Sequence, residues 1–158
     1  MAAPRVLFLC TGNYYRSRFA EELFNALAEQ RGLPWRADSK ALAERLETLV
    51  DNVGPLSNDV LRGLSDRGYR PLRPDRYPHA VTADAFSGFT RIVAMDEAEH
   101  RPMIEARFAE HARSVEYWNV PDTAALDPER ALAALDRHVR TLIEQCASGE
   151  PEWKPRAV

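Results

Sequence analysis

A short apolar run at residues 5–9 leads into Cys10, and a helical pattern begins at Arg16. The run has the β-branched and aromatic character of a strand that is buried on both faces of a sheet. After Arg16, apolar residues recur every four positions, at Phe19, Leu23 and Leu27. This spacing is typical of an amphipathic helix. The sequence therefore predicts a strand, a loop and a helix in succession, with Cys10 at the carboxyl end of the strand.

The remainder of the chain repeats this alternation. Apolar runs predict further strands over residues 35–39, 91–95 and 115–118. Helices are predicted from the N-cap residues Ser57 and Asp127 and over residues 97–110, and residues 41–50 have helical composition. This order predicts one doubly wound α/β domain over residues 1–158, with a four-stranded parallel sheet and helices on both faces. We expect its core within residues 4–146 and a C-terminal tail over residues 147–158.

Size and charge exclude several classes of protein. The chain has 158 residues, a formal net charge of −3 and a pI near 5.8, so it lacks the positive charge of a typical nucleic-acid-binding protein. No apolar run reaches the length of a membrane span, and the first residues lead into a strand without a signal peptide. We therefore expect a cytoplasmic protein, monomeric or weakly dimeric, that binds neither nucleic acid nor membranes.

Residue types that bind metals or form disulfides are few. The two cysteines, Cys10 and Cys146, are expected to be thiols, because a reducing compartment disfavours structural disulfides. The histidines show no metal-ligand spacing with one another or with a cysteine, and we interpret each as a surface residue. They are His79, His100, His111 and His138. The sequence thus predicts no metal.

The loop between the first strand and the first helix combines groups that bind and attack a phosphoryl centre. The helix that follows offers free amides and a dipole that favour the thiolate of Cys10 over the thiol. The planar fork of Arg16 matches two phosphoryl oxygens, and the Ser17 hydroxyl can donate to the thiolate. Gly12 permits unusual backbone conformations, and Asn13 tolerates the left-handed region. We expect the phosphoryl group to be bound by Thr11, Gly12, Asn13, Tyr14, Tyr15, Arg16 and Ser17.

This loop resembles the Cys-x5-Arg-Ser signature of the low-molecular-weight protein tyrosine phosphatases and of the arsenate reductases that share their fold. The resemblance extends to Met95-Asp96 at the end of a predicted strand. It also includes residues 118–122, which are similar to the family's general-acid loop. It implies a phosphatase that forms a cysteinyl phosphate on Cys10, binds phosphate through Arg16 and needs no cofactor. The implied substrate is a phosphorylated protein or a small aryl phosphate.

Two aspartates compete for the role of general acid. Asp122 lies just after the last predicted strand, where the family places its acid loop, and it is the preferred candidate. Asp127 is followed by Pro128, as in the family's Asp-Pro dipeptide, but N-capping explains its position at a helix start. The resemblance implies that the acid protonates the leaving group and then activates water.

The sequence departs from the family in three places. Tyr15 stands where typical members carry a second cysteine that can protect the nucleophile from oxidation, so that safeguard is absent. Arg18 replaces a common proline, and we interpret it as a solvated arginine of the first helical turn. Residues 123–125 lack the aromatic side chains that wall the family's phosphotyrosine slot. Specificity for phosphotyrosine is therefore open.

Two other functions stay open. Arsenate mimics phosphate, so the loop could serve an arsenate reductase. Because residues 80–90 contain no cysteine and Cys146 lies in the last predicted helix, its reductant would be an external low-molecular-weight thiol. A phosphate- or phosphopeptide-binding module with weak turnover is the third hypothesis. Four arginines within residues 67–76 could attract an acidic peptide, but we interpret this stretch as a solvated loop.

Overall fold

The computed structural model of the protein describes residues 3–122 and 125–149. Its four strands form one sheet in the order β2-β1-β3-β4, and every neighbouring pair is parallel. The strands are β1 (Arg5–Cys10), β2 (Arg36–Ala41), β3 (Arg91–Ala94) and β4 (Glu116–Tyr117). The predicted four-stranded parallel sheet is confirmed.

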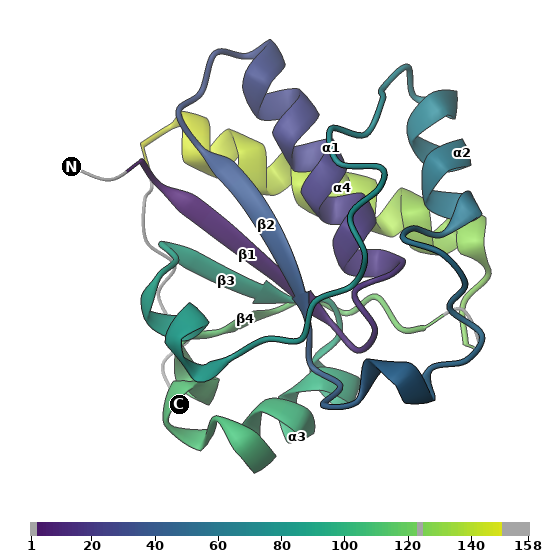
Figure 1. Ribbon diagram of the computed structural model, residues 1–158. Helices are drawn as coiled ribbons and strands as arrows, with labels where there is room; N and C mark the ends of the chain where they lie inside the picture. Colours follow the sequence, from purple (N-terminus) through teal and green to yellow (C-terminus); the bar gives the residue numbers. More distant parts are fainter. Residues whose placement is uncertain (1–2, 123–124, 150–158) are drawn as a thin grey trace.

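Helices cover both faces of this sheet (Figure 1). Helices α1 (Arg16–Gln30) and α4 (Pro128–Ala147) pack together on one face, with α2 (Asn58–Asp66) beside them. Helix α3 (Glu97–Arg107) lies on the opposite face. Because β2 and β3 pair with opposite edges of β1, the strand order reverses between β1 and β3. In such sheets the ligand crevice opens beyond the carboxyl ends of the strands at this reversal.

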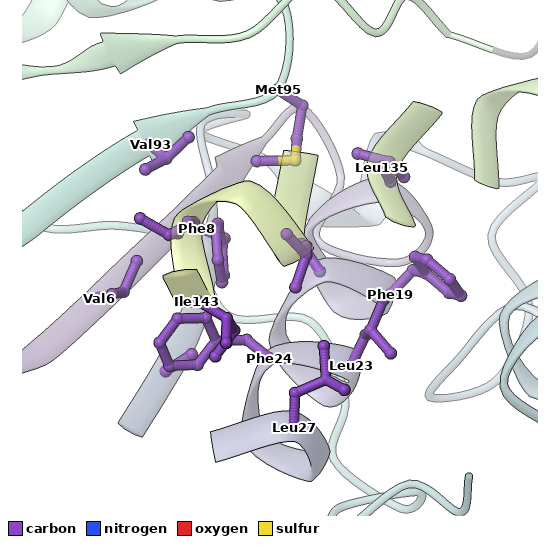
Figure 2. Close-up of a cluster of buried hydrophobic side chains, with 14 of the residues drawn as sticks. Val6, Phe8, Phe19, Leu23, Phe24, Leu27, Val93, Met95, Leu135 and Ile143 are labelled. Atoms are coloured by element: carbon purple, nitrogen blue, oxygen red, sulfur yellow. The ribbon is translucent and has the colours of Figure 1, made fainter. Parts of the chain in front are cut away.

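The alternating side chains of β1 contribute to two separate hydrophobic cores. Val6 and Phe8 face α1 and α4, and Figure 2 shows them packed with the apolar residues of those helices. Leu7 and Leu9 belong to the second core, on the side of α3. Successive residues of a strand point to opposite faces, so a strand with a core on each side must be apolar throughout. This requirement explains the unbroken apolar run before Cys10.

Both predicted N-caps are confirmed. The Ser57 hydroxyl accepts a hydrogen bond from the backbone N–H of Asp59 at 3.1 Å, at the start of α2. The Asp127 carboxylate accepts from the backbone N–H of Arg130 at 3.1 Å, at the start of α4. Each side chain thus satisfies a backbone donor that the first helical turn leaves unpaired.

The prediction of helical structure over residues 41–50 is wrong. The backbone N–H groups of Leu42 and Ala43 donate to the carbonyl oxygens of Cys10 and Thr11. This pairing continues the association of β2 with β1 past the end of the sheet and keeps the backbone extended. Only one turn of 3-10 helix, Leu46–Thr48, forms in the segment.

Two further predictions concern the end of a helix and the C-terminal tail. The helix predicted over residues 97–110 ends at Arg107, because the φ of −136° at Phe108 takes the chain out of the helical region. A 3-10 helix, Ala109–Ser114, follows. The predicted tail over residues 147–158 lies outside the described residues from residue 150 onward. Within the described ranges, no helix is both long and apolar enough to cross a membrane.

Candidate active site

Cys10 and Ser17 stand at the two ends of the loop between β1 and α1, and the fold brings their side chains into contact. The Cys10 Sγ lies 3.0 Å from the Ser17 Oγ, and both residues are buried. The Asn13 amide donates to the same Ser17 oxygen at 2.9 Å. Because this oxygen already accepts a hydrogen bond from Asn13, the proton of the Ser17 hydroxyl is available to the sulfur.

Asn13 holds the loop in its shape. Its backbone is in the left-handed region, with φ of 52°. Its Nδ2 also donates to the Ser39 Oγ at 2.8 Å, while its Oδ1 accepts from the His79 backbone N–H and from Arg76, each at 3.1 Å. A backbone N–H can only donate, so the His79 contact fixes which end of the amide is the oxygen. Asn13 thereby ties the loop to β2 and to the segment before β3.

Gly12 allows a close approach of another segment. A Cβ atom at this position would lie 2.7 Å from the Asn52 Nδ2 and 3.2 Å from the Leu49 Cδ1, and the left-handed residue of the loop is Asn13 rather than Gly12. A cavity of about 250 Å³ adjoins Gly12 at this place. Its lining consists of Gly12, Leu46, Glu47, Leu49, Asn52, Gly54, Tyr77 and Pro78. The loop after β2 thus forms one wall of the space beside the predicted phosphate loop.

The Arg16 guanidinium is buried and held from one side. Its Nη1 and Nη2 donate to the two carboxylate oxygens of Glu99 at 2.9 and 2.7 Å. Its Nη1 also donates to the Val120 carbonyl at 2.9 Å. Burial lowers the pKa of Arg16, but the hydrogen bond to Glu99 and nearby negative charges outweigh burial and raise it above its usual value. Arg16 is therefore a fixed cation at the carboxyl end of the sheet.

Tyr14 and Tyr15 connect the loop to neighbouring segments. The Tyr14 hydroxyl donates to the Val53 carbonyl at 2.7 Å, in the loop that lines the cavity. The Tyr15 hydroxyl donates to the Pro128 carbonyl at 3.0 Å, in the first turn of α4. Burial raises the pKa of Tyr15, so this hydroxyl keeps its proton and its role as a donor. Tyr15 thus joins the loop to the segment that carries both candidate acids.

Asp122 and Asp127 both lie in the connection between β4 and α4. Asp127 caps α4, whereas the exposed Asp122 lies before the helix and is followed by residues 123–124, which are outside the described ranges. Beyond the effects of burial and of Glu99, the charge of Asp122 raises the pKa of Arg16. Burial and the charge of Asp59 raise the pKa of Tyr15, and the charges of Asp122 and Asp127 raise it further. Both candidate acids therefore act electrostatically on the loop.

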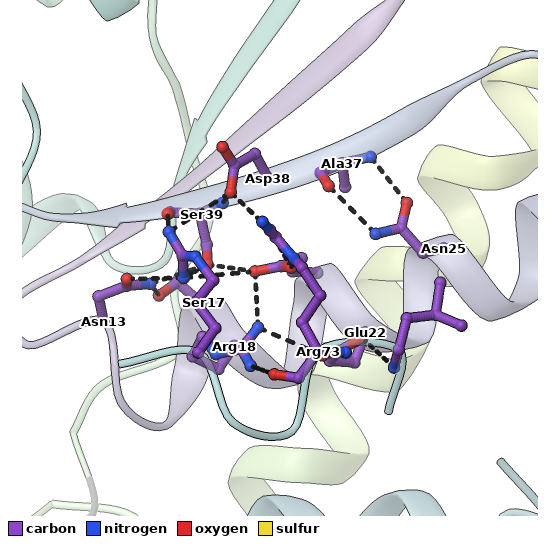
Figure 3. Close-up of polar contacts among 12 residues, drawn as sticks. Asn13, Ser17, Arg18, Glu22, Asn25, Ala37, Asp38, Ser39 and Arg73 are labelled. Carbon is purple, nitrogen blue, oxygen red and sulfur yellow. Dashed lines mark hydrogen bonds and ion pairs between the residues drawn. The ribbon is translucent and has the colours of Figure 1, made fainter. Parts of the chain in front are cut away.

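A network of buried charges lies behind the loop (Figure 3). Arg18, expected to be solvated, is fully buried, so that prediction is wrong. Its Nη1 lies 2.8 Å from Glu21 and 3.3 Å from Glu22, three and four residues further along α1. Both glutamates are also buried. Residues at this spacing are neighbours on a helix, so Arg18 finds two negative partners on the same buried face.

We expected residues 67–76 to form a solvated loop, but two of their arginines bind other parts of the protein. Arg73 donates to the buried Glu21 at 3.0 Å and to Asp38 at 2.7 Å. Arg76, whose side chain is 9% exposed, contacts Asn13. This segment therefore folds onto α1 and β2, and it supports the loop from behind.

His100 is fully buried, so the surface interpretation is wrong for this histidine. Its Nδ1 accepts from the backbone N–H of Asp96 at 3.0 Å, and its Nε2 lies 3.1 Å from the Glu99 carboxylate. In the part of the chain that the structure describes, no three His, Cys, Asp or Glu side chains are grouped so that they could hold a metal ion.

Comparison with known proteins identifies the family. A family model described as low molecular weight phosphotyrosine protein phosphatase matches residues 5–149. The chain belongs to this family. It is accordingly a cysteine-dependent phosphatase, and Cys10 stands at the start of its loop. A comparison with curated protein sequences gives no significant match.

Solved structures share the fold at low sequence identity. A low molecular weight phosphotyrosine phosphatase from Vibrio cholerae O395 is 22% identical with a TM-score of 0.75, and the match covers 92% of this chain and 98% of that one. Wzb from Vibrio vulnificus, in complex with benzylphosphonate, is 15% identical with a TM-score of 0.74 and coverages of 91% and 99%. The arginine phosphatase YwlE from Bacillus subtilis is 19% identical with a TM-score of 0.73 and coverages of 90% and 95%.

Sequence reasoning missed three residues that contact the phosphatase loop. Glu99 and His100 follow β3, and a polar residue just beyond a strand's carboxyl end is a signal that could have identified Glu99. Arg76 carries no such signal. Its contact with Asn13 depends on how a proline-containing segment folds back over 63 residues of chain.

Proposed function

We propose that this phosphatase hydrolyses phosphomonoesters of proteins in the cytoplasm, with phosphotyrosine as the preferred substrate, and that it needs no cofactor. The observation that supports this most directly is the 3.0 Å contact between Cys10 and Ser17 in the loop that also carries the fixed Arg16 cation. A thiol nucleophile, a hydroxyl donor and a bidentate cation are the groups that displacement at a phosphoryl centre requires.

The proposed reaction has two steps. The Cys10 sulfur attacks phosphorus, the bond from phosphorus to the leaving oxygen breaks, and Asp122 gives its proton to that oxygen. Water then loses a proton to Asp122 and attacks the cysteinyl phosphate, which restores the thiolate and releases inorganic phosphate. Arg16 and the loop amides hold the phosphoryl oxygens in both steps, while Ser17 stabilises the thiolate as attacking and leaving group.

The cavity beside Gly12 is the proposed site for the organic part of the substrate. It adjoins the loop directly, and Tyr77 and Leu49 line it. Tyr77 is 60% exposed, so its ring is accessible to a ligand. This ring is our candidate for the aromatic wall that residues 123–125 do not supply. Aromatic rings stack on one another with a modest gain in free energy.

Replacing Tyr77 with alanine tests this assignment. We expect KM for phenyl phosphate to rise several-fold with little change in kcat, because the ring contacts the substrate away from the reacting atoms. Steady-state kinetics with phenyl phosphate measures both constants, and Leu72→Ala, at an exposed position outside the cavity lining, serves as the control. An unchanged KM would remove Tyr77 from the substrate site.

The acid assignment is tested by two matched variants, Asp122→Asn and Asp127→Asn. We expect Asp122→Asn to lower kcat for phenyl phosphate by roughly 10²-fold or more, because a general acid commonly contributes this much. The loss should be smaller for p-nitrophenyl phosphate, whose leaving group needs less protonation. Asparagine is also a good N-cap, so Asp127→Asn should keep α4 intact and remain within a few-fold of wild type. If Asp127→Asn were instead the slow variant, Asp127 would be the acid.

Substrate class is tested by direct comparison of candidate substrates. We expect release of phosphate from phenyl phosphate and from a phosphotyrosine peptide, with much slower release from phosphoarginine, the type of substrate that the name of YwlE suggests. Cys146 is a poor internal reductant for arsenate, because burial raises its pKa to about 11 and it lies near Arg91, at the amino end of β3, so arsenate reduction would depend on an external thiol. Arsenite formation with an added small thiol, without turnover of phenyl phosphate, would overturn the proposal.

A further inference from the structure

Glu99 contacts Arg16, the residue that we expect to bind the phosphoryl group. It lies in the first turn of α3 and receives two parallel hydrogen bonds from Arg16. The Thr11 hydroxyl donates to the same carboxylate. The Arg16 side chain is 4% exposed and that of Glu99 is 29% exposed, so the pair is largely shielded from solvent. Burial raises the pKa of Glu99, but its hydrogen bonds to His100, Arg16 and Thr11 hold the pKa well below its usual range.

His100 fixes the position of Glu99 from the protein interior. Because the His100 Nδ1 accepts from the backbone N–H of Asp96, the ring proton of the neutral tautomer is on Nε2. That nitrogen lies 3.1 Å from the Glu99 carboxylate and can donate to it. The rigid start of α3 is thereby connected through His100 and Glu99 to Arg16.

The contacts of Arg16 leave one edge of its guanidinium for a ligand. A guanidinium has five N–H groups. Among the described residues, Glu99 and Val120 take both protons of Nη1 and one proton of Nη2. The Nε–H and the second Nη2–H remain, and in the planar guanidinium they point in parallel from the adjacent edge. This pair of donors has the fork geometry that matches two phosphoryl oxygens.

We propose that Glu99 is a positioning residue, which orients Arg16 so that its Nε–Nη2 edge faces the phosphoryl group. The inference rests on the proposed function, since it assigns Arg16 to phosphate binding. A carboxylate so close to the site also repels a phosphate dianion. The two effects have opposite signs: loss of orientation weakens phosphate binding, whereas loss of repulsion strengthens it. The sign of the change in affinity therefore decides between them.

Glu99→Gln removes the charge and one acceptor while keeping the shape of the side chain. We expect the dissociation constant for inorganic phosphate to rise several-fold and kcat/KM for phenyl phosphate to fall about 10²-fold, the size of effect that a small misplacement of a reacting group produces. Phosphate affinity is measured by protection of Cys10 against alkylation by iodoacetate, which needs no turnover. Glu97→Gln, the same change at an exposed residue of the same helical turn, should leave both values unchanged.

A double-mutant cycle with Arg16→Ala separates positioning from charge. If Glu99 acts through Arg16, Glu99→Gln changes phosphate affinity in the wild-type background and not in the Arg16→Ala background. Tighter phosphate binding in both backgrounds would overturn the proposal. Equal unfolding midpoints of Glu99→Gln and wild type confirm that the variant is folded, and Thr11→Val should give a smaller loss of affinity in the same direction. Because affinity is measured without catalysis, a wild type that binds phosphate without turnover would contradict the proposed function and leave this test intact.

Discussion

Cys10→Ser is expected to abolish hydrolysis of phenyl phosphate, with kcat lower by roughly 10⁴-fold or more. The oxygen of a serine remains protonated at neutral pH, and no histidine or other general base contacts this position among the residues that the structure describes. The contact to Ser17 would then join two hydroxyl groups, neither of them ionised. Phosphate release from phenyl phosphate under substrate saturation is the measurement.

The matched control is the second cysteine. Cys146 is buried in α4, and Cys146→Ala should retain wild-type kcat. Cys10→Ser should still bind inorganic phosphate, because Arg16 and the loop backbone are unchanged, and a rise in its unfolding temperature with added phosphate would show this. Residual activity within tenfold of wild type would rule out Cys10 as the nucleophile.

Arg18→Ala is expected to lower the free energy of unfolding by roughly 3–5 kcal/mol, a large part of the typical stability of about 5–15 kcal/mol. Among the described residues, the substitution leaves the buried Glu22 without a cation, while the buried Glu21 keeps Arg73 and Arg76. Removing one partner of a buried ion pair is costly because the remaining charge has lost both water and its partner. Urea-induced unfolding, analysed with a common m-value, measures the change.

An exposed arginine provides the comparison. The Arg62 side chain is 70% exposed and pairs only loosely with Asp59, at 3.3 Å, so Arg62→Ala should change stability by less than about 0.5 kcal/mol. A similarly small effect of Arg18→Ala would mean that the network of Figure 3 adds nothing to stability. Loss of stability without loss of phosphate affinity would separate this network from the loop that it supports.

Patterns along the chain predicted the sheet, the main helices and both N-caps correctly. Strand β1 was identifiable because a strand with a core on each face must be apolar at every position. The caps at Ser57 and Asp127 were identifiable because capping depends on neighbours two or three residues away. The prediction of helical structure over residues 41–50 was wrong, because the hydrogen bonds that keep this segment extended are made to the end of another strand.

Side-chain environments at the site could not be predicted in the same way. Arg18 and His100 have polar side chains of the kind usually found at the surface, yet both are fully buried. Their burial depends on partners that the fold supplies, and a single polar residue in a sequence does not identify its partners. For Arg18 the partners were near in sequence, at Glu21 and Glu22, but nothing local indicated that this face of α1 would be covered.

The sequence by itself determined the strand, loop and helix that carry Cys10, Arg16 and Ser17, and with them the family to which the chain belongs. These features are local, because a strand end, a tight loop and a helix start are specified by residues that follow one another. The tertiary structure alone decided that Glu99, 83 residues from Arg16, fixes the cation. Parallel strands bring their carboxyl ends to one edge of the sheet, and residues far apart in the chain meet there.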